Sequence, residues 1–536
     1  MDCVWRTATG RIGGDSMEVP DIINYLESQY QTKLQDGSIR KELPDTNGDE
    51  KPKDIKVGQI GDTLAALCVE RFRRFEDTLM VFNGKRYEMV HPEAMRRVIY
   101  GWLMRVGVGP AYLARSVDSL MKMLLRYPFL EKYEPKRNVI YCRNCVVVLN
   151  SDGEVQTFNS GPEWMSNIYL DIDYFALSMC PQWEKFLSTV IDDPNAVKVL
   201  QEFLGAMFID KSELSVETAL FLYGIGSNGK SVICETLGAL LGDNMSSVGL
   251  SQVNGGTGDY YAAKLTGKLL AYNSDENAKD IGSGRFKQLV SKEKLMARTP
   301  YGTPFETDDW PMFMANINKA IITSDSSEGF WRRNKVIKFS KRFVDNPDAS
   351  LGELKADKTF KTKMLGELPG ILNWILMGRT RLIAQRGVFT KSRDIERVTE
   401  EMRCESTAVF SFLEYKGYTG RRKPEGVYNE LRVNGKELYQ EYRQWCAENG
   451  YTDSKNVNRF KNDMEFAGVI FKKSIKFADG SVTSGYILYQ ILDRGDDDDL
   501  PMTDEEKREF AAQARAKQFI ESDRELFDGN DEDLPF

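Results

Sequence analysis

The sequence contains little histidine and little cysteine. Its only histidine is His91, in a chain of 536 residues, and histidine-based metal sites and Ser-His-Asp triads become improbable on that count. Eight cysteines in so long a chain do not form a disulfide framework. Cys142 and Cys145 have the spacing of half a zinc site, but no second Cys pair follows them. We therefore interpret them as small residues of neighbouring buried strands, with a zinc site as the alternative.

Long apolar runs are also missing. No stretch approaches the roughly 20 residues that a membrane-spanning helix needs, and the first residues, Met-Asp-Cys-Val-Trp-Arg, lack the layout of a signal peptide. With 41% hydrophobic and 28% charged residues, the composition is that of an ordinary globular protein. We expect a cytoplasmic protein without a membrane partner.

The negative charge is concentrated at one end of the chain. The net charge is −8, and residues 493–536 alone hold sixteen Asp or Glu and six Lys or Arg. The other 492 residues therefore sum to +2. Because the body is near neutral and carries local basic patches, the overall charge does not exclude a nucleic-acid partner.

The most informative motif is Gly-Ile-Gly-Ser-Asn-Gly-Lys-Ser at residues 224–231, which fits the P-loop pattern G-x-x-x-x-G-K-[ST]. A strand-like apolar stretch precedes it and a helix-like stretch follows. The glycines let backbone N–H groups close around phosphate oxygens, and the helix N-terminus adds positive potential. We predict that the motif binds ATP, with Lys230 on the β- and γ-phosphates and Ser231 on Mg²⁺. The predicted ATP-binding residues are Gly224, Ser227, Asn228, Gly229, Lys230 and Ser231.

Two later strand-like stretches end in polar residues suited to ATP hydrolysis. Residues 268–274 lead into Asp275, predicted to hold Mg²⁺ directly or through water, and Glu276, predicted to polarise the attacking water. Residues 311–315 lead into Asn316, which could orient water against the γ-phosphate. Asn318 is the alternative, because a shift of two residues keeps the same strand face.

A paired-arginine motif follows, Gly-Phe-Trp-Arg-Arg at residues 329–333. Arginines next to an aromatic anchor suit an arginine finger, which stabilises charge on the transferring phosphoryl group. Both Arg332 and Arg333 are candidates, and a surface basic pair is the alternative.

These motifs, in this order, resemble those of the superfamily 3 helicases, and more closely the phage, plasmid and poxvirus primase-helicase ATPases. Residues 179–187, 367–374 and 437–446 resemble further family segments, so the likeness spans about residues 60–490. The resemblance implies an AAA+-like ring, usually hexameric, with ATP at subunit interfaces and the arginine finger donated by the neighbour. It also implies 3′→5′ translocation on single-stranded DNA in a bacterial host cytoplasm.

The family's channel hairpin corresponds to residues 291–302. Lys294 and Arg298 could follow phosphates there, and Tyr301 could stack on a base. An ordinary surface hairpin is the alternative. Many relatives carry a primase domain ahead of the helicase, but here only about 135 residues precede the segments that match the pre-ATPase and ATPase domains. Asp171 and Asp173 mimic a two-metal acid pair, but they fall in the segment that matches the pre-ATPase domain. We therefore expect no primase activity.

The expected fold class is α/β: a P-loop AAA+-like ATPase with a parallel sheet, a helical or α+β N-terminal domain and a C-terminal winged helix. In the winged helix, Lys455 and Arg459 would lie at the recognition helix and Lys472 and Lys473 on the wing, for duplex or fork binding. Protein docking is the alternative role. The expected segments are 1–57 (flexible), 58–207 (mostly helical), 208–390 (ATPase), 405–492 (winged helix) and 493–536 (acidic, disordered).

The last residues, Asp-Glu-Asp-Leu-Pro-Phe, resemble the acidic terminus of bacterial single-stranded-DNA-binding proteins. The apolar end could anchor in a partner's pocket while the acids steer it, which predicts recruitment of host replication proteins. A solubilising tail is the alternative.

Two functions remain after these steps. The first is an ATP-driven replicative helicase of a phage or mobile element, and the second is a P-loop initiator that uses ATP for assembly on an origin without translocating. A small-molecule kinase is disfavoured by the Asn-ended strand followed by Trp-Arg-Arg.

Overall fold

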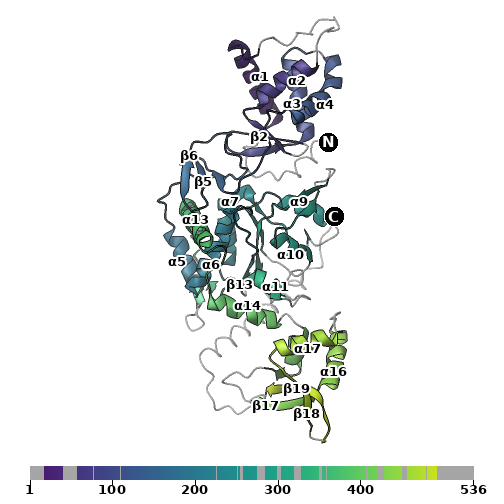
Figure 1. Ribbon diagram of the computed structural model, residues 1–536. Coiled ribbons are helices and arrows are strands. Elements are labelled where there is room, and N and C mark those ends of the chain that lie inside the picture. Colours follow the sequence, from purple (N-terminus) through teal and green to yellow (C-terminus); the bar gives the residue numbers. More distant parts are fainter. Residues whose placement is uncertain are drawn as a thin grey trace, which may run out of the picture.

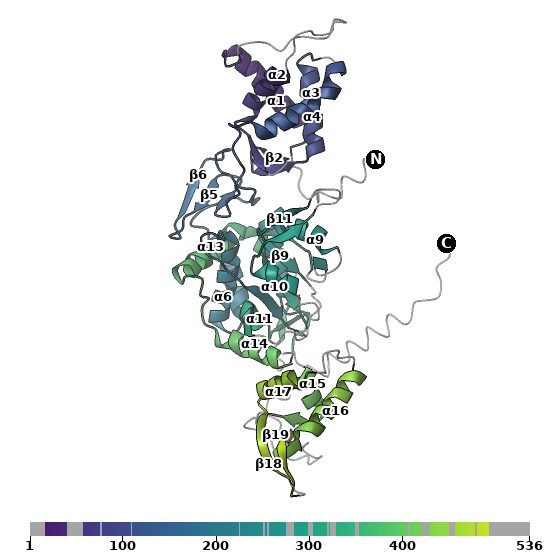
Figure 2. The ribbon, with the colours of Figure 1, turned by 45° about the vertical axis from the view of Figure 1, so that its right-hand side comes forward.

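The computed structural model describes residues 17–39, 57–75, 78–108, 110–224, 226–249, 252–253, 257–274, 284–298, 304–318, 321, 328–348, 353–357, 359–405, 408–420, 428–449, 456–477 and 480–491. The N-terminal helices lie at one end of the molecule, an α/β domain lies in the middle, and the C-terminal domain lies at the other end (Figures 1 and 2). Within these ranges, every helix is too short or too polar to cross a bilayer.

The N-terminal domain packs four helices against an antiparallel sheet. Apolar residues three and four apart give each helix a face to bury, and Trp102 of α3 is fully buried beside Tyr30 of α1, with ring centroids 6.1 Å apart. Strand β2 pairs with β3 in a hairpin, and Gly84 in its turn has a φ of 98°, a region that favours glycine. The elements are α1 (Val19–Gln35), α2 (Val57–Cys68), β1 (Phe72–Phe75), β2 (Thr78–Phe82), β3 (Tyr87–Val90), α3 (Pro92–Arg105) and α4 (Pro110–Arg126).

Helix α1 corrects one prediction. It lies within residues 1–57, for which we expected a flexible segment, yet its Ile22, Leu26 and Tyr30 are buried in the domain core. These residues recur at every fourth position, which is the spacing of a buried helical face. The polar residues around them obscured that pattern.

A small antiparallel sheet connects this domain to the next. Its strands are β4 (Val139–Tyr141), β5 (Val146–Leu149) and β6 (Val155–Phe158). Cys142 and Cys145 lie in the turn between β4 and β5, where the Cys142 N–H donates to the Cys145 carbonyl at 2.8 Å. Nearby, Asp173 pairs with Arg143 at 3.2 Å, and Asp171 lies 4.0 Å from the same guanidinium. Arg143 is therefore the partner of both acids.

The middle domain is built on a five-stranded parallel sheet with the order β13-β7-β12-β9-β8. Leu222 and Met314 face one layer of helices, whereas Phe221 and Phe313 face the other. Burial on both faces explains why the strands read as apolar runs, and the predicted α/β architecture is confirmed. The strands are β7 (Ala219–Tyr223), β8 (Met245–Ser246), β9 (Leu270–Asn273), β12 (Met312–Ile317) and β13 (Asn334–Lys338). The first layer holds α5 (Pro181–Val190), α6 (Pro194–Gly205), α7 (Lys230–Leu241), α12 (Phe360–Gly366) and α13 (Leu368–Ala384), and the second holds α9 (Gly258–Leu265), α10 (Gly284–Val290), α11 (Glu328–Arg333) and α14 (Arg393–Glu405).

Two segments that carry the family resemblance pack directly on each other. The Glu367 carboxylate accepts the N–H groups of Gln182 and Trp183 at 3.0–3.1 Å and so caps the start of α5. The Trp183 ring meets the Trp374 ring edge to face, with centroids 5.8 Å apart. Segments 184 residues apart in sequence therefore pack together in the first helix layer.

Helices α6 and α13 contact each other closely at Gly205 of α6 and Gly378 of α13. A Cβ on Gly378 would lie 2.1 Å from the Gln201 carbonyl oxygen, and a Cβ on Gly205 would lie 2.2 Å from the Arg379 backbone nitrogen. The Gln201 side chain also donates to the Trp374 carbonyl at 2.7 Å. The two helices therefore touch backbone to backbone, and only glycine fits there.

Replacing Gly378 with alanine is expected to lower the free energy of unfolding by about 3 kcal/mol, because the new methyl group overlaps a backbone that cannot yield. Thermal denaturation followed by circular dichroism measures this change. Gly366→Ala is the matched control, since nothing lies within 4 Å of its Cβ position, and it should alter stability by less than about 1 kcal/mol. Equal stability of the two variants would contradict the expectation.

Among its described residues the C-terminal domain contains three helices and a terminal hairpin, together with a strand that the sequence did not predict. Strand β17 pairs along its whole length with β19, and only scattered positions of β17 are apolar. Lys472 and Lys473 are exposed on β18, Arg459 lies in α17, and Lys455 falls outside the described residues. The elements are α15 (Ala408–Tyr415), β16 (Tyr418–Thr419), β17 (Tyr428–Asn434), α16 (Gly435–Glu448), α17 (Val457–Phe466), β18 (Ile470–Lys476) and β19 (Val482–Ile491).

Candidate nucleotide site

The carboxyl ends of β7 and β12 bring the predicted site residues to one edge of the sheet. Gly224 directly follows β7, and its N–H donates to the Ile317 carbonyl of β12 at 3.2 Å. Asn316 lies in β12 in register with Leu222 of β7. Strand β9 ends at the same edge because it runs parallel to β12, but Asp275 and Glu276, which follow it, lie outside the described residues.

The P-loop has the backbone shape of an anion-binding turn. Gly226, Ser227 and Gly229 have φ values of 38°, 50° and 91°, a region that favours glycine. A Cβ on Gly224 would lie 2.2 Å from the Asn228 side-chain nitrogen and 2.7 Å from the Phe339 carbonyl oxygen. Helix α7 then begins at Lys230 with no side chain capping it. The loop therefore presents a helix N-terminus to the site.

Lys230 lies inside the loop rather than in solvent. It is only 5% exposed, and its Nζ donates to the Gly224 carbonyl and, at 3.1 Å, to the Asn318 side-chain oxygen. Asn318 thus lies next to the P-loop lysine, whereas Asn316 lies two residues further back in the strand. Ser231, the next residue of α7, is exposed.

Two buried amides near the loop lack complete hydrogen bonding within the described part of the chain. The side-chain nitrogen of Asn228 and the side-chain oxygen of Asn316 have no partner there, and each residue is 3% exposed. Unsatisfied buried polar atoms are rare in folded proteins. Asn228 belongs to the P-loop itself, and Asn316 lies near the end of β12 that adjoins the loop.

The two arginines of α11 lie at the opposite edge of the sheet. Helix α11 runs directly into β13, whose first residue, Asn334, pairs with Ala219, the first residue of β7. The five residues of β7 separate this edge from the P-loop by roughly 13 Å. The arginines are therefore remote from the P-loop of their own subunit.

The surroundings of the two arginines differ. Arg333 points inward, where its guanidinium contacts Glu217 at 3.0 and 3.1 Å and the Ser291 hydroxyl at 3.0 Å. Arg332 is exposed, and no hydrogen bond or ion pair of its side chain occurs among the residues described. Sequence reasoning missed Glu217, because an acid before a strand has no distinguishing pattern.

A hairpin lies at the position predicted for the channel hairpin. Strands β10 (Leu295–Ala297) and β11 (Phe305–Thr307) pair antiparallel, Lys294 and Arg298 are exposed, and Tyr301 at the tip is outside the described ranges. At its base Lys292 is buried, and burial together with the nearby Arg137 lowers the pKa of this amine to about 8. Lys294 and Arg298 therefore extend from a firmly packed base.

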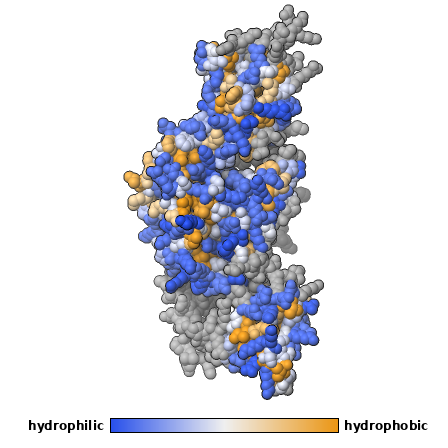
Figure 3. Space-filling view, in the orientation of Figure 1, coloured by the Kyte–Doolittle hydropathy of each residue, from blue (hydrophilic) through white to orange (hydrophobic). Residues whose placement is uncertain are grey.

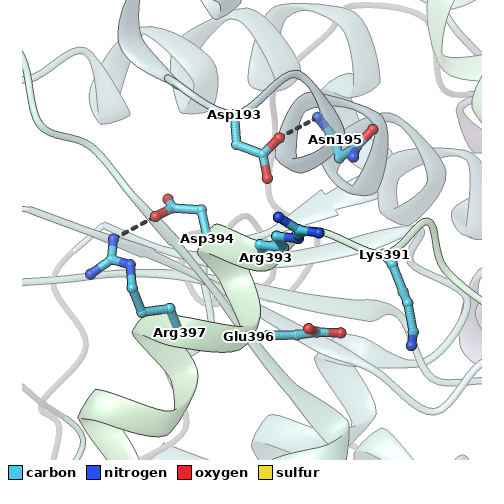
Figure 4. Close-up of a pocket in the computed structure, with 7 residues that line it drawn as sticks. All are labelled: Asp193, Asn195, Lys391, Arg393, Asp394, Glu396 and Arg397. Carbon is cyan, nitrogen blue, oxygen red and sulfur yellow. Dashed lines mark hydrogen bonds and ion pairs between the residues drawn. The ribbon is translucent and has the colours of Figure 1, made fainter.

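A separate hollow of about 810 Å³ lies between the starts of α6 and α14. Figure 4 shows that charged side chains of both signs line it, including Asp193, Arg393 and Arg397. No residue of the P-loop takes part. The hollow is therefore distinct from the candidate nucleotide site.

Comparisons with known proteins give two findings. A model described as "Family of unknown function (DUF5906)" matches residues 222–333, which run from the end of β7 to the end of α11. Apo structures of the NrS-1 C-terminal region are similar at 13% identity (81% of this chain, 99% of that chain, TM-score 0.39), at 11% identity (75%, 85%, 0.39) and at 14% identity (66%, 96%, 0.33). At these TM-scores the likeness carries no argument. The comparison with curated proteins gave no match.

Proposed function

We propose that this protein is an ATP-dependent replicative DNA helicase of the ring-forming superfamily 3 type, from a phage or mobile element. The observation that carries the proposal is the position of the P-loop and Arg332 at opposite edges of one parallel sheet. Such a subunit cannot bring its own Arg332 to its own P-loop, but packing side by side brings it to a neighbour's. The layout supports a closed ring, and the sequence resemblance implies a hexamer.

At the nucleotide, Lys230 would turn from the Gly224 carbonyl to the β- and γ-phosphates, and Ser231 and Asp275 would hold Mg²⁺. When bound, Mg²⁺ would neutralise negative charge on the nucleotide. Glu276 polarises the attacking water. Arg332 of the neighbouring subunit stabilises the charge that develops on the transferring group, whereas Arg333 holds α11 in place through Glu217.

The contact with Lys230 favours Asn318 over Asn316 as the residue that orients the water. Asn318→Ala is expected to reduce the kcat of ATP hydrolysis by about 100-fold, since it removes an oriented polar group close to the reacting phosphate. Asn316→Ala is the matched control and should reduce kcat by less than about tenfold. Steady-state hydrolysis at saturating ATP measures both. A larger loss in Asn316→Ala would reverse the assignment.

For DNA, exposed Lys294 and Arg298 would follow the phosphates of a single strand in the channel, with Tyr301 stacking on a base. Lys455, Arg459, Lys472 and Lys473 would contact duplex ahead of the fork. The terminal Leu-Pro-Phe would recruit host replication proteins. Deleting residues 534–536 should weaken the binding of these partners. If binding is unchanged, the terminal residues do not recruit them.

A forked-DNA unwinding assay tests the central proposal. Wild-type protein is expected to separate the strands only with hydrolysable ATP and Mg²⁺, and Lys230→Ala is expected to separate none. If wild type hydrolyses ATP and assembles on DNA but never unwinds it, the protein is the initiator type of ATPase instead.

A further inference from the structure

Two consecutive aspartates between α5 and α6 bind different parts of the domain. Asp192 accepts a hydrogen bond from the Ser340 hydroxyl at 2.6 Å, and Lys341 lies 3.6 Å from its other oxygen. Ser340 belongs to the segment after β13 that lies against the P-loop, where the Phe343 N–H donates to the Ser227 carbonyl at 2.7 Å. The segment that contains Ser340 and Phe343 therefore connects Asp192 to the P-loop through hydrogen bonds at both ends.

Asp193 faces the other way and holds the start of α14. It accepts from the Ser392 hydroxyl at 2.6 Å and from the Asn195 N–H at 2.8 Å. Ser392 in turn caps α14, because the Ile395 N–H donates to its hydroxyl oxygen at 3.1 Å. Burial raises the pKa of Asp193, but the hydrogen bonds from Ser392 and the backbone outweigh it and keep the pKa below its ordinary value. The carboxylate that holds α14 is thus charged at neutral pH.

Helix α5 also connects this turn to the P-loop, because its residues pack against Gly229. A Cβ on Gly229 would lie 3.0 Å from the Phe186 ring and 3.4 Å from Val190. Val190 is the last residue of α5, two positions before Asp192. A conformational change in the P-loop can therefore reach the Asp192–Asp193 turn through two sets of contacts, one made by α5 and one made by Ser340.

The start of α14 has room to move. The hollow beside it is lined by Asp193, Lys391 and Arg393 (Figure 4), and neither Lys391 nor Arg393 forms an ion pair with any described residue. Asp193 and Arg393 line the same hollow, so an ion pair between them would be the second arrangement of this joint if Ser392 releases Asp193. Coupling between sites requires such a two-state element.

We propose that the Asp192–Asp193 turn couples ATP binding at the P-loop to the position of α14, and through α14 to the C-terminal domain, whose first helix, α15, contacts α14. The proposal rests on the proposed function only in requiring that the P-loop bind nucleotide. Lys230 must leave the Gly224 carbonyl to reach a phosphate, so the loop shifts on binding, and Phe343 and Ser340 carry the shift to Asp192.

Hydrogen exchange of the full chain, with and without a non-hydrolysable ATP analogue and Mg²⁺, tests the coupling. In wild type the analogue should protect the P-loop and change exchange in residues 390–398 by about threefold or more. In Ser340→Ala the change at residues 390–398 should disappear while the Kd for the analogue stays within about twofold. Ser188→Ala is the matched control, because its hydroxyl donates only to the Lys185 carbonyl within α5, and it should behave as wild type.

The outcomes separate the two proposals. P-loop protection without any change at residues 390–398, or an undiminished change in Ser340→Ala, overturns the coupling and leaves nucleotide binding intact. No protection at the P-loop overturns both.

Discussion

Replacing Lys230 with alanine is expected to reduce ATP hydrolysis by about 100-fold or more. The lysine is 5% exposed and already held inside the P-loop by the Gly224 carbonyl and Asn318. It therefore supplies a positive charge from a largely desolvated side chain, and such a charge stabilises the reacting phosphates more strongly than one in solvent. Release of inorganic phosphate, measured at saturating ATP, reports the loss.

The controls for Lys230→Ala must distinguish a loss of catalysis from a loss of folding. Lys230→Met keeps the apolar stem in its buried position and should lose as much activity as alanine at a higher melting temperature. Lys361→Ala removes a lysine that is 69% exposed and paired with Glu235, and it should keep wild-type activity. Hydrolysis by both Lys230 variants within threefold of wild type would remove the P-loop as the catalytic site.

Arg332→Ala is expected to lower ATP hydrolysis by about a thousandfold, as for other arginine fingers, while nucleotide binding by a single subunit persists. The reason is geometric, since Arg332 lies at the amino edge of the sheet and the P-loop at the carboxyl edge. Arg333→Ala should instead destabilise α11, because it removes the ion pair with Glu217 and the hydrogen bond to Ser291. Comparing hydrolysis with melting temperature distinguishes the two variants.

Mixing two inactive variants gives a sharper test of this arrangement. Arg332→Ala subunits retain an intact P-loop, and Lys230→Ala subunits retain an intact Arg332. In a random equal mixture about a quarter of the interfaces combine both intact parts, so hydrolysis should recover to about a quarter of wild type. If the mixture stays as inactive as either variant alone, the arginine does not act across subunits.

The sequence predicted the features that depend on local spacing. The P-loop, the apolar strands and the hairpin turns follow from residues close together in the chain, so their patterns are readable. The pairing of Glu217 with Arg333 joins residues 116 positions apart, and nothing local marks either one. The contact that favours Asn318 over Asn316, between Lys230 and Asn318, likewise joins residues 88 positions apart. Strand β17 was missed because it pairs along one side and alternates poorly.

The separation of the P-loop from Arg332 also has a counting consequence for the proposed assembly. In an open row of subunits, the first P-loop and the last Arg332 have no neighbour to complete them, whatever the length of the row. Only closure gives every subunit a working site. Diluting the protein should therefore lower the ATPase activity per subunit more steeply than the loss of contacts between neighbours in short open rows would. A ring that opens to admit DNA would hydrolyse no ATP at the opened interface.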